Sequence, residues 1–230
     1  MGLNIAVFVP EGIVLSSDSL AFLRQNDEGF EASSKRTFTV WNRFLVSFVG
    51  GGFINGKPYG YYIQEIESKR NSIQIDHVKH FTEFFLEFFK HFHNENEEPF
   101  IVYIAGSSIE ESRLHHELYL IDCDNIIKLN ESNEKNEVYN YHMIGRGLWI
   151  NKLVLPTTFE DQQSEVNELF EAAKIDFSKY SLEDAEKFAQ FLICTTAQMD
   201  KFIQTRATVN LNITTGTVTS QGTTIKEYDL

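Results

Sequence analysis

The chain has little cysteine, few basic residues and no long apolar run. Its 230 residues include only two cysteines, Cys123 and Cys194, which form no CxxC pair and lack the spacing of metal ligands. We therefore expect both thiols to be reduced and to pack as small apolar side chains, as in a reducing cytosol.

The shortage of positive charge restricts the partners that the protein can bind. Lys and Arg number 20 against 33 Asp and Glu, which gives a net charge of −13. Phosphate binding needs clustered Lys and Arg, so we expect no nucleic-acid partner and no adhesion to anionic lipid.

The N-terminus and the apolar segments give no sign of export or of membrane insertion. The start MGLNIAVFVPEG lacks the basic region and the long apolar stretch of a signal peptide. No apolar run approaches the ~20 residues of a membrane span. We expect a soluble cytoplasmic protein, and because no repeat or linker interrupts the chain, a single domain over residues 1–230.

Short apolar runs bounded by Gly, Pro and Asn predict β-strands along much of the chain. The first two, joined by Pro10, Glu11 and Gly12, predict an antiparallel hairpin, and a turn at Thr215-Gly216 is expected near the C-terminus. The predicted strands cover 3–9, 13–17, 36–40, 44–50, 100–106, 116–122, 124–130, 139–147 and 208–214, with TVTS after the last turn.

Helices are predicted between these groups of strands. Seven apolar residues from Val78 to Phe92 recur every three or four positions, as on one face of a helix that Asp76 would cap. Ser181 with Asp184 forms a capping box before an apolar face that runs to Phe202. Further helices are expected near 59–70, 148–155 and 165–174. The order of elements predicts an α+β protein with two antiparallel sheets flanked by helices.

Neither the histidines nor the serines make a strong case for a catalytic or metal site. His77 and His80 lie three residues apart on the Phe-rich helix, but no convergent ligand set is evident, and we expect neither a metal nor a cofactor. Ser16, Ser17 and Asp18 have no histidine partner at a known spacing, so a conventional triad is unsupported.

Five motifs follow one another in an order that resembles the proteasome β subunit and the related bacterial ATP-dependent protease. They are GIVLSSDS (12–19), SSKRTFTV (33–40), FLVSFVGGG (44–52), MIGRG (143–147) and SLEDAEKFAQFLICTTAQMDKF (181–202). The resemblance spans nearly the whole chain. It implies the N-terminal-nucleophile hydrolase fold, a four-layer αββα sandwich, and a homo-oligomer that forms rings.

In that family the nucleophile is the hydroxyl of an N-terminal threonine, and the free α-amine of the same residue is its base. The resemblance places Gly2 at this position, so no hydroxyl is present, and Asp18 at the aspartate that orients the catalytic lysine. The lysine position falls on Arg36, with Lys35 adjacent and available after a one-residue shift. We expect Asp18 and Arg36 to form an ion pair, at least half-buried, beneath this site.

The remaining family positions are partly kept. Asp200 matches the late aspartate, but Ile203 stands where the family has a serine, and Arg146 replaces the serine between two glycines. The turn whose backbone N–H groups hold the oxyanion matches three glycines, Gly50, Gly51 and Gly52.

Two functions remain open. The favoured one is a catalytically inactive or altered protein of this family that acts by self-assembly or by binding a peptide or protein partner. The alternative is an active threonine-type peptidase or other amide hydrolase with an unrecognised nucleophile. We expect no propeptide, because the first strand begins directly after Met1, and removal of Met1 would expose only a glycine amine.

Overall fold

Two five-stranded sheets form the centre of the molecule. The computed structural model describes residues 2–25, 28–92, 100–110, 112–130, 139–145, 175–203 and 209–229. Every strand pair in these ranges is antiparallel, and helices accompany both sheets, so the expected mixed α+β architecture with two antiparallel sheets is confirmed.

The first sheet has the order β12-β1-β2-β13-β14 and the second the order β11-β10-β9-β6-β5. The strands of the first sheet are β1 (Leu3–Val9), β2 (Gly12–Asp18), β12 (Asn140–Gly145), β13 (Asn212–Thr219) and β14 (Gly222–Asp229). Those of the second are β5 (Thr37–Val40), β6 (Phe44–Val49), β9 (Ile101–Glu110), β10 (Arg113–Asp122) and β11 (Asn125–Lys128). Two small hairpins add β3 (Leu20–Gln25) with β4 (Glu28–Ser33), and β7 (Phe53–Ile54) with β8 (Lys57–Pro58).

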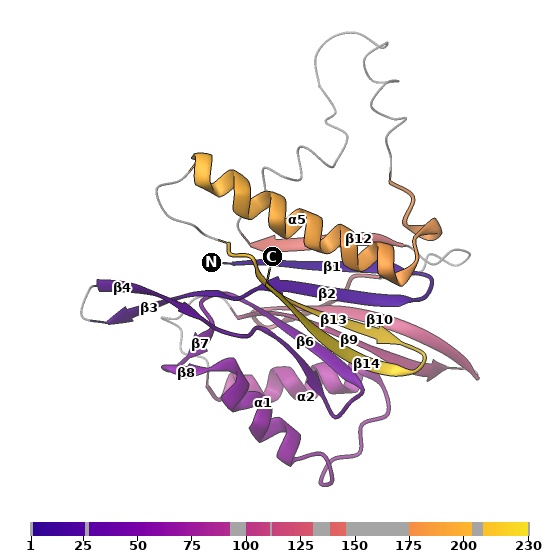
Figure 1. Cartoon of the computed structure of the whole chain (residues 1–230). Coiled ribbons are helices and arrows are strands. Elements are labelled where there is room, and N and C mark those ends of the chain that lie inside the picture. The colour runs from indigo at the N-terminus through magenta and orange to yellow at the C-terminus, as the bar shows by residue number, and fades with distance from the viewer. Residues whose placement is uncertain are drawn as a thin grey trace, which may run out of the picture.

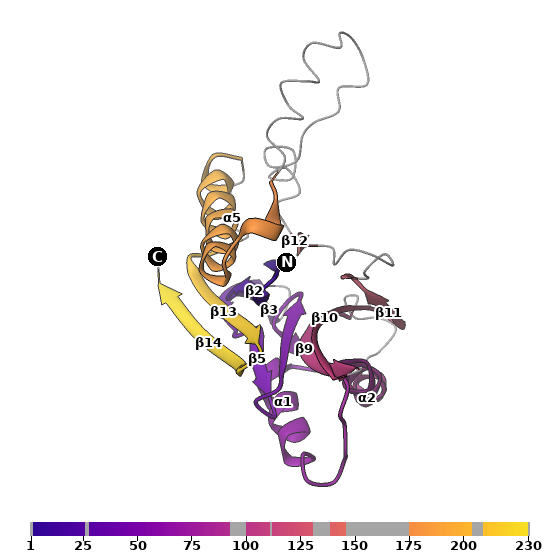
Figure 2. The ribbon, with the colours of Figure 1, turned by 90° about the vertical axis from the view of Figure 1, so that its right-hand side faces the viewer.

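Helices cover the outer faces of both sheets. Figure 1 shows α5 (Leu182–Ile203) along one side of the first sheet, and α1 (Tyr59–Ser68) and α2 (Val78–Lys90) on the far side of the second. The view turned by 90° in Figure 2 shows the same arrangement, with α5 and α2 on opposite sides of the strands. No helix within the described ranges has both the length and the apolar character that crossing a bilayer requires.

Strand β1 is apolar throughout because both of its faces are buried. Leu3, Ile5 and Val7 belong to the core beneath α5, whereas Ala6 and Phe8 belong to the core between the two sheets. Successive side chains of a strand point to opposite faces, so one continuous apolar run supplies both cores. Asn4 is the polar exception on the face toward the second sheet.

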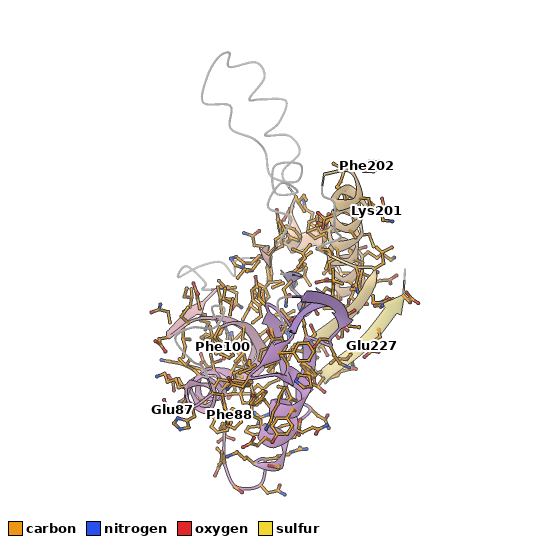
Figure 3. All side chains as sticks on the ribbon, turned by 90° about the vertical axis from the view of Figure 1, so that its left-hand side faces the viewer. Glu87, Phe88, Phe100, Lys201, Phe202 and Glu227 are labelled. Carbon is orange, nitrogen blue, oxygen red and sulfur yellow. The ribbon has the colours of Figure 1, made fainter. Side chains whose placement is uncertain are left out.

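Phenylalanine fills the layer between α2 and the second sheet. The predicted apolar face of α2 is confirmed, because Phe81, Phe85 and Phe89 are fully buried or nearly so and belong to one core cluster with Phe48 of β6. Phe88 and Phe100 join this cluster, while Glu87 lies on the exposed side of α2 (Figure 3). Burial of these rings is a major stabilising contribution of this half of the molecule.

The two predicted helix starts had different outcomes. The capping box of α5 is confirmed, since Ser181 Oγ accepts from Asp184 N at 3.1 Å and Ser181 N donates to Asp184 Oδ2 at 3.2 Å. Capping of α2 by Asp76 is wrong. The N-cap is His77, whose side chain makes no cap, and the first free N–H group, that of Val78, donates instead to Ser108 Oγ of β9.

The turn expected at Thr215-Gly216 is also wrong, because both residues lie within β13. Gly216 is where β13 passes close to β6: a Cβ there would lie 2.8 Å from Leu45 Cδ2. The glycine therefore permits close packing of the sheets, and the chain reverses only after Thr219, before β14. The helices expected at 148–155 and 165–174 lie outside the described residues.

Candidate functional site

A buried ion pair lies at the end of the first sheet, where β2 ends and β5 begins. Arg36 Nη1 is 2.5 Å from Asp18 Oδ1, and neither side chain has any exposed surface. Arg36 also donates to two backbone oxygens, from Nη1 to Asp18 O at 3.2 Å and from Nη2 to Leu20 O. The expectation of a buried pair between these two residues is confirmed.

The Asp18 carboxylate also accepts three backbone hydrogen bonds. Oδ1 accepts from Leu3 N at 2.8 Å, and Oδ2 accepts from Leu20 N at 3.1 Å and from Asn210 N at 3.3 Å. Burial raises the pKa of the Asp18 carboxyl above its usual value, and the Arg36 guanidinium and the three N–H groups act against that rise. One side chain thus joins the start of β1, the start of β3 and the segment before β13.

Gly2 lies against this pair, and its missing side chain leaves the space that the pair fills. A Cβ atom added to Gly2 would overlap Arg36 Nη1 and Asp18 Oδ1. Gly2 is itself buried. No residue larger than glycine fits position 2 unless both the Arg36 guanidinium and the Asp18 carboxylate shift.

The choice between Lys35 and Arg36 is settled by their opposite directions. Lys35 is exposed and its Nζ pairs with Glu227 Oε1 of β14 at 2.7 Å, away from the site. Glu227 is labelled on the outer strand β14 in Figure 3. Of these two cations it is Arg36 that contacts Asp18, and the one-residue shift that would place Lys35 there does not occur.

The glycine turn lies beside the segment that carries Arg36. Gly50 and Gly52 have φ values of 131° and 93°, a backbone conformation that glycine adopts most readily. The turn is tied to this segment because Ser34 Oγ donates to Gly52 O at 3.0 Å, and β6, which leads into the turn, is tied to it because Phe48 N donates to Arg36 O at 3.0 Å. Gly51, between the two, completes the predicted turn.

The two late positions of the predicted site differ in what can be said of them. Asp200 is buried in the last part of α5, which ends on the same side of the molecule as the N-terminus (Figure 1). Arg146 lies outside the described residues. The structure thus brings Gly2, Asp18 and Arg36 into contact, with the glycine turn adjacent.

Asn210 is a member of the site that sequence reasoning missed. Its backbone N–H reaches Asp18, its Oδ1 accepts from Ser19 N at 3.1 Å, and its Nδ2 donates to Ser19 Oγ at 3.2 Å. The partners are 191 and 192 residues apart in sequence, and nothing in the local pattern around Asn210 connects them.

Buried hydroxyl and amide groups continue from the site into the space between the sheets. Asn4 Nδ2 donates to Ser47 Oγ at 2.7 Å, and Thr37 Oγ1 lies 2.8 Å from both Ser47 Oγ and Ser17 Oγ. Two polar atoms here, Asn4 Oδ1 and Arg36 Nε, have no hydrogen-bond partner among the described residues. The network ties β1, β2, β5 and β6 together.

A surface pocket lies elsewhere, between the start of α2 and strands β10 and β11, and it contains none of the predicted site residues. Glu117, one of its lining residues, accepts from Ser108 Oγ, Tyr119 Oη and Lys128 Nζ, the last at 2.8 Å. Burial alone would raise the pKa of Glu117, but the hydrogen bonds from Lys128 and Ser108 outweigh it and lower the pKa. Glu117, the buried carboxylate among the lining residues of this pocket, thus already has hydrogen-bond partners within the chain.

Comparison of the chain with protein-family models and with curated proteins found no match in either. The function therefore has to be argued from the geometry around Gly2, Asp18 and Arg36.

Proposed function

We propose that the chain is a catalytically inactive protein with the proteasome-type N-terminal-nucleophile hydrolase fold, a four-layer αββα sandwich, and that it acts by self-assembly or by binding a partner. Two antiparallel sheets with helices on their outer faces support the fold assignment. The contact of the first residue before β1 with a carboxylate at the end of β2 supports the placement of the former active site.

The observation that carries this proposal is the overlap between a side chain at position 2 and the Arg36–Asp18 pair. Catalysis of this type needs a hydroxyl on the N-terminal residue, with the α-amine beside it as base. At position 2 the chain has no side chain, and the volume that one would occupy holds the Arg36 guanidinium. Position 2 thus lacks a nucleophile, and the Arg36 guanidinium occupies the space that its side chain would need.

Arg36 is also unsuited to the role of the family's lysine. Its planar guanidinium differs in geometry from an ammonium group, and it is committed to Asp18 and to the carbonyl oxygen of Leu20. It therefore acts as a structural cation that holds β2, β3 and the start of β5 together.

No specific observation favours hydrolysis by another nucleophile. Ser16 Oγ lies 2.8 Å from Thr215 Oγ1, and Ser17 Oγ lies 2.8 Å from Thr37 Oγ1. All four side chains are buried, and each hydroxyl has another hydroxyl as its partner. A nucleophile needs both access to substrate and an adjacent base, and these hydroxyls have neither in the described part of the chain.

A peptidase assay with an N-terminal-threonine-directed inhibitor tests the loss of catalysis. The protein is incubated with a panel of fluorogenic peptides and with a peptide epoxyketone, and the intact mass records the mature N-terminus and any adduct. An active threonine peptidase serves as the positive control. We expect neither turnover nor adduct, and turnover that the inhibitor abolishes would overturn the proposal.

Light scattering after size exclusion tests self-assembly separately. One chain has a mass of 26.6 kDa, so light scattering should give a ring a mass that is a multiple of this value. A single species of one-chain mass at all concentrations would remove self-assembly and leave partner binding, whatever the outcome of the peptidase assay.

A further inference from the structure

A side-chain hydrogen bond connects β9 of the second sheet with β12, an edge strand of the first sheet. Tyr103 Oη of β9 lies 2.6 Å from His142 Nδ1 of β12. Tyr103 is fully buried, and His142 is partly buried. β12 is the edge strand of its sheet, and in the described part of the chain its backbone pairs with β1 alone.

Burial shifts the pKa values of both partners in this pair. Burial raises the pKa of the Tyr103 hydroxyl well above its usual value and lowers that of the His142 imidazole, with no charged group contributing to either shift. When the neutral imidazole carries its proton on Nε2, the Tyr103 hydroxyl donates to Nδ1. The hydrophobic cluster between the sheets that contains Tyr103 also contains Ala6, Phe8, Leu118 and Leu120.

We propose that Tyr103 donates to His142 Nδ1 and that this hydrogen bond is an acid-sensitive latch that holds β12 against the second sheet. Protonation of Nδ1 turns the acceptor into a donor, so the buried tyrosine hydroxyl loses its acceptor and a positive charge enters an apolar space. Beyond this bond, β12 keeps its ladder to β1 and the packing of Met143 beneath α5.

The pH range in which the latch weakens follows from the direction in which burial shifts the His142 pKa. The closed state binds a proton at His142 less readily than the open state does, so acid favours opening. The latch is fully effective above the ordinary histidine pKa of 6.5 and weakens as the pH falls below that value. Each unit by which closure lowers the His142 pKa allows the opening constant of β12 to rise by about tenfold.

Hydrogen–deuterium exchange of the full chain at pH 7.5 and pH 5.0 tests the latch. After correction for intrinsic exchange, amides of β12 should lose protection at pH 5.0, by up to about tenfold for each unit of pKa shift. Amides of β13, in the middle of the same sheet, are the internal control and should keep theirs. The variant His142→Gln retains a side-chain acceptor without titrating near neutrality, so its β12 protection should be independent of pH.

An NMR titration of the His142 ring in the parent protein gives a second readout that does not depend on any variant folding. The ring should titrate below 6.5, because burial disfavours its charged form. The latch is refuted by a His142 pKa at or above 6.5 in the parent, by β12 protection equal at both pH values, or by the same loss of protection in His142→Gln.

Discussion

Two adjacent cations, Lys35 and Arg36, have opposite environments. Arg36 is buried with Asp18, and neither side chain is exposed, whereas 41% of the Lys35 side chain and 66% of that of Glu227 remain exposed. The two pairs have similar short distances, 2.5 and 2.7 Å. Distance alone therefore does not indicate what an ion pair contributes to stability.

The difference lies in what surrounds each charge. Removing Arg36 and Asp18 from water is costly, and the cost is offset by backbone groups of Leu3, Leu20 and Asn210 in addition to the mutual attraction. Lys35 and Glu227 are solvated, so solvent screens their attraction and ordering two long side chains costs entropy. Removing one partner should therefore lower the free energy of unfolding much more for the Arg36–Asp18 pair than for the Lys35–Glu227 pair.

The largest effect is expected from Asp18→Asn. The change leaves the Arg36 guanidinium buried without a counter-charge, and it should lower the free energy of unfolding by about 3–5 kcal/mol. Chemical denaturation measures this, with Glu227→Gln as the matched control for loss of a carboxylate from an ion pair. If Asp18→Asn unfolds at the same denaturant concentration as the parent, the pair is not buried as described.

Arg36→Lys keeps the charge and should have an intermediate effect. An ammonium cannot reproduce the planar fork that reaches both Asp18 and the Leu20 carbonyl oxygen, so we expect a loss of about 1–3 kcal/mol. The same denaturation experiment measures it. A variant as stable as the parent would show that only the charge of Arg36 is needed.

Lys35→Ala should have the smallest effect. Its pair with Glu227 lies at the surface, and we expect a change of at most about 1 kcal/mol that shrinks further in high salt. Measuring the free energy of unfolding at two salt concentrations checks both statements. A loss comparable to that of Asp18→Asn would remove the distinction between the two pairs.

Local interactions explain which parts of the fold could be predicted from the sequence. The hairpin of β1 and β2, the buried face of α2 and the capping box at Ser181 depend on residues close together in the chain. Asp18 and Arg36 were expected to pair, but the sequence alone left Lys35 as an alternative because both cations precede the same strand.

Contacts between distant segments could not be predicted. Nothing around Asn210 indicates that it binds Asp18, and Gly216 looked like a turn because its role depends on Leu45 of the other sheet. Val78 receives its cap from Ser108, which lies on a strand 30 residues further along. In each case the contact depends on tertiary packing between segments that are distant in the sequence, and no local sequence pattern indicates it.

The central claim is that the Arg36–Asp18 pair fills the space of a side chain at position 2, and Gly2→Ala tests it most directly. The matched control is Gly60→Ala in α1, where an added Cβ lies 3.5 Å from the Phe38 ring, an ordinary contact. Denaturation should show that Gly2→Ala loses about 1–3 kcal/mol, because the guanidinium must move, while Gly60→Ala gains about 0.5–1 kcal/mol from its helix. A Gly2→Ala protein as stable as the parent would contradict the claim and reopen position 2 to a nucleophile.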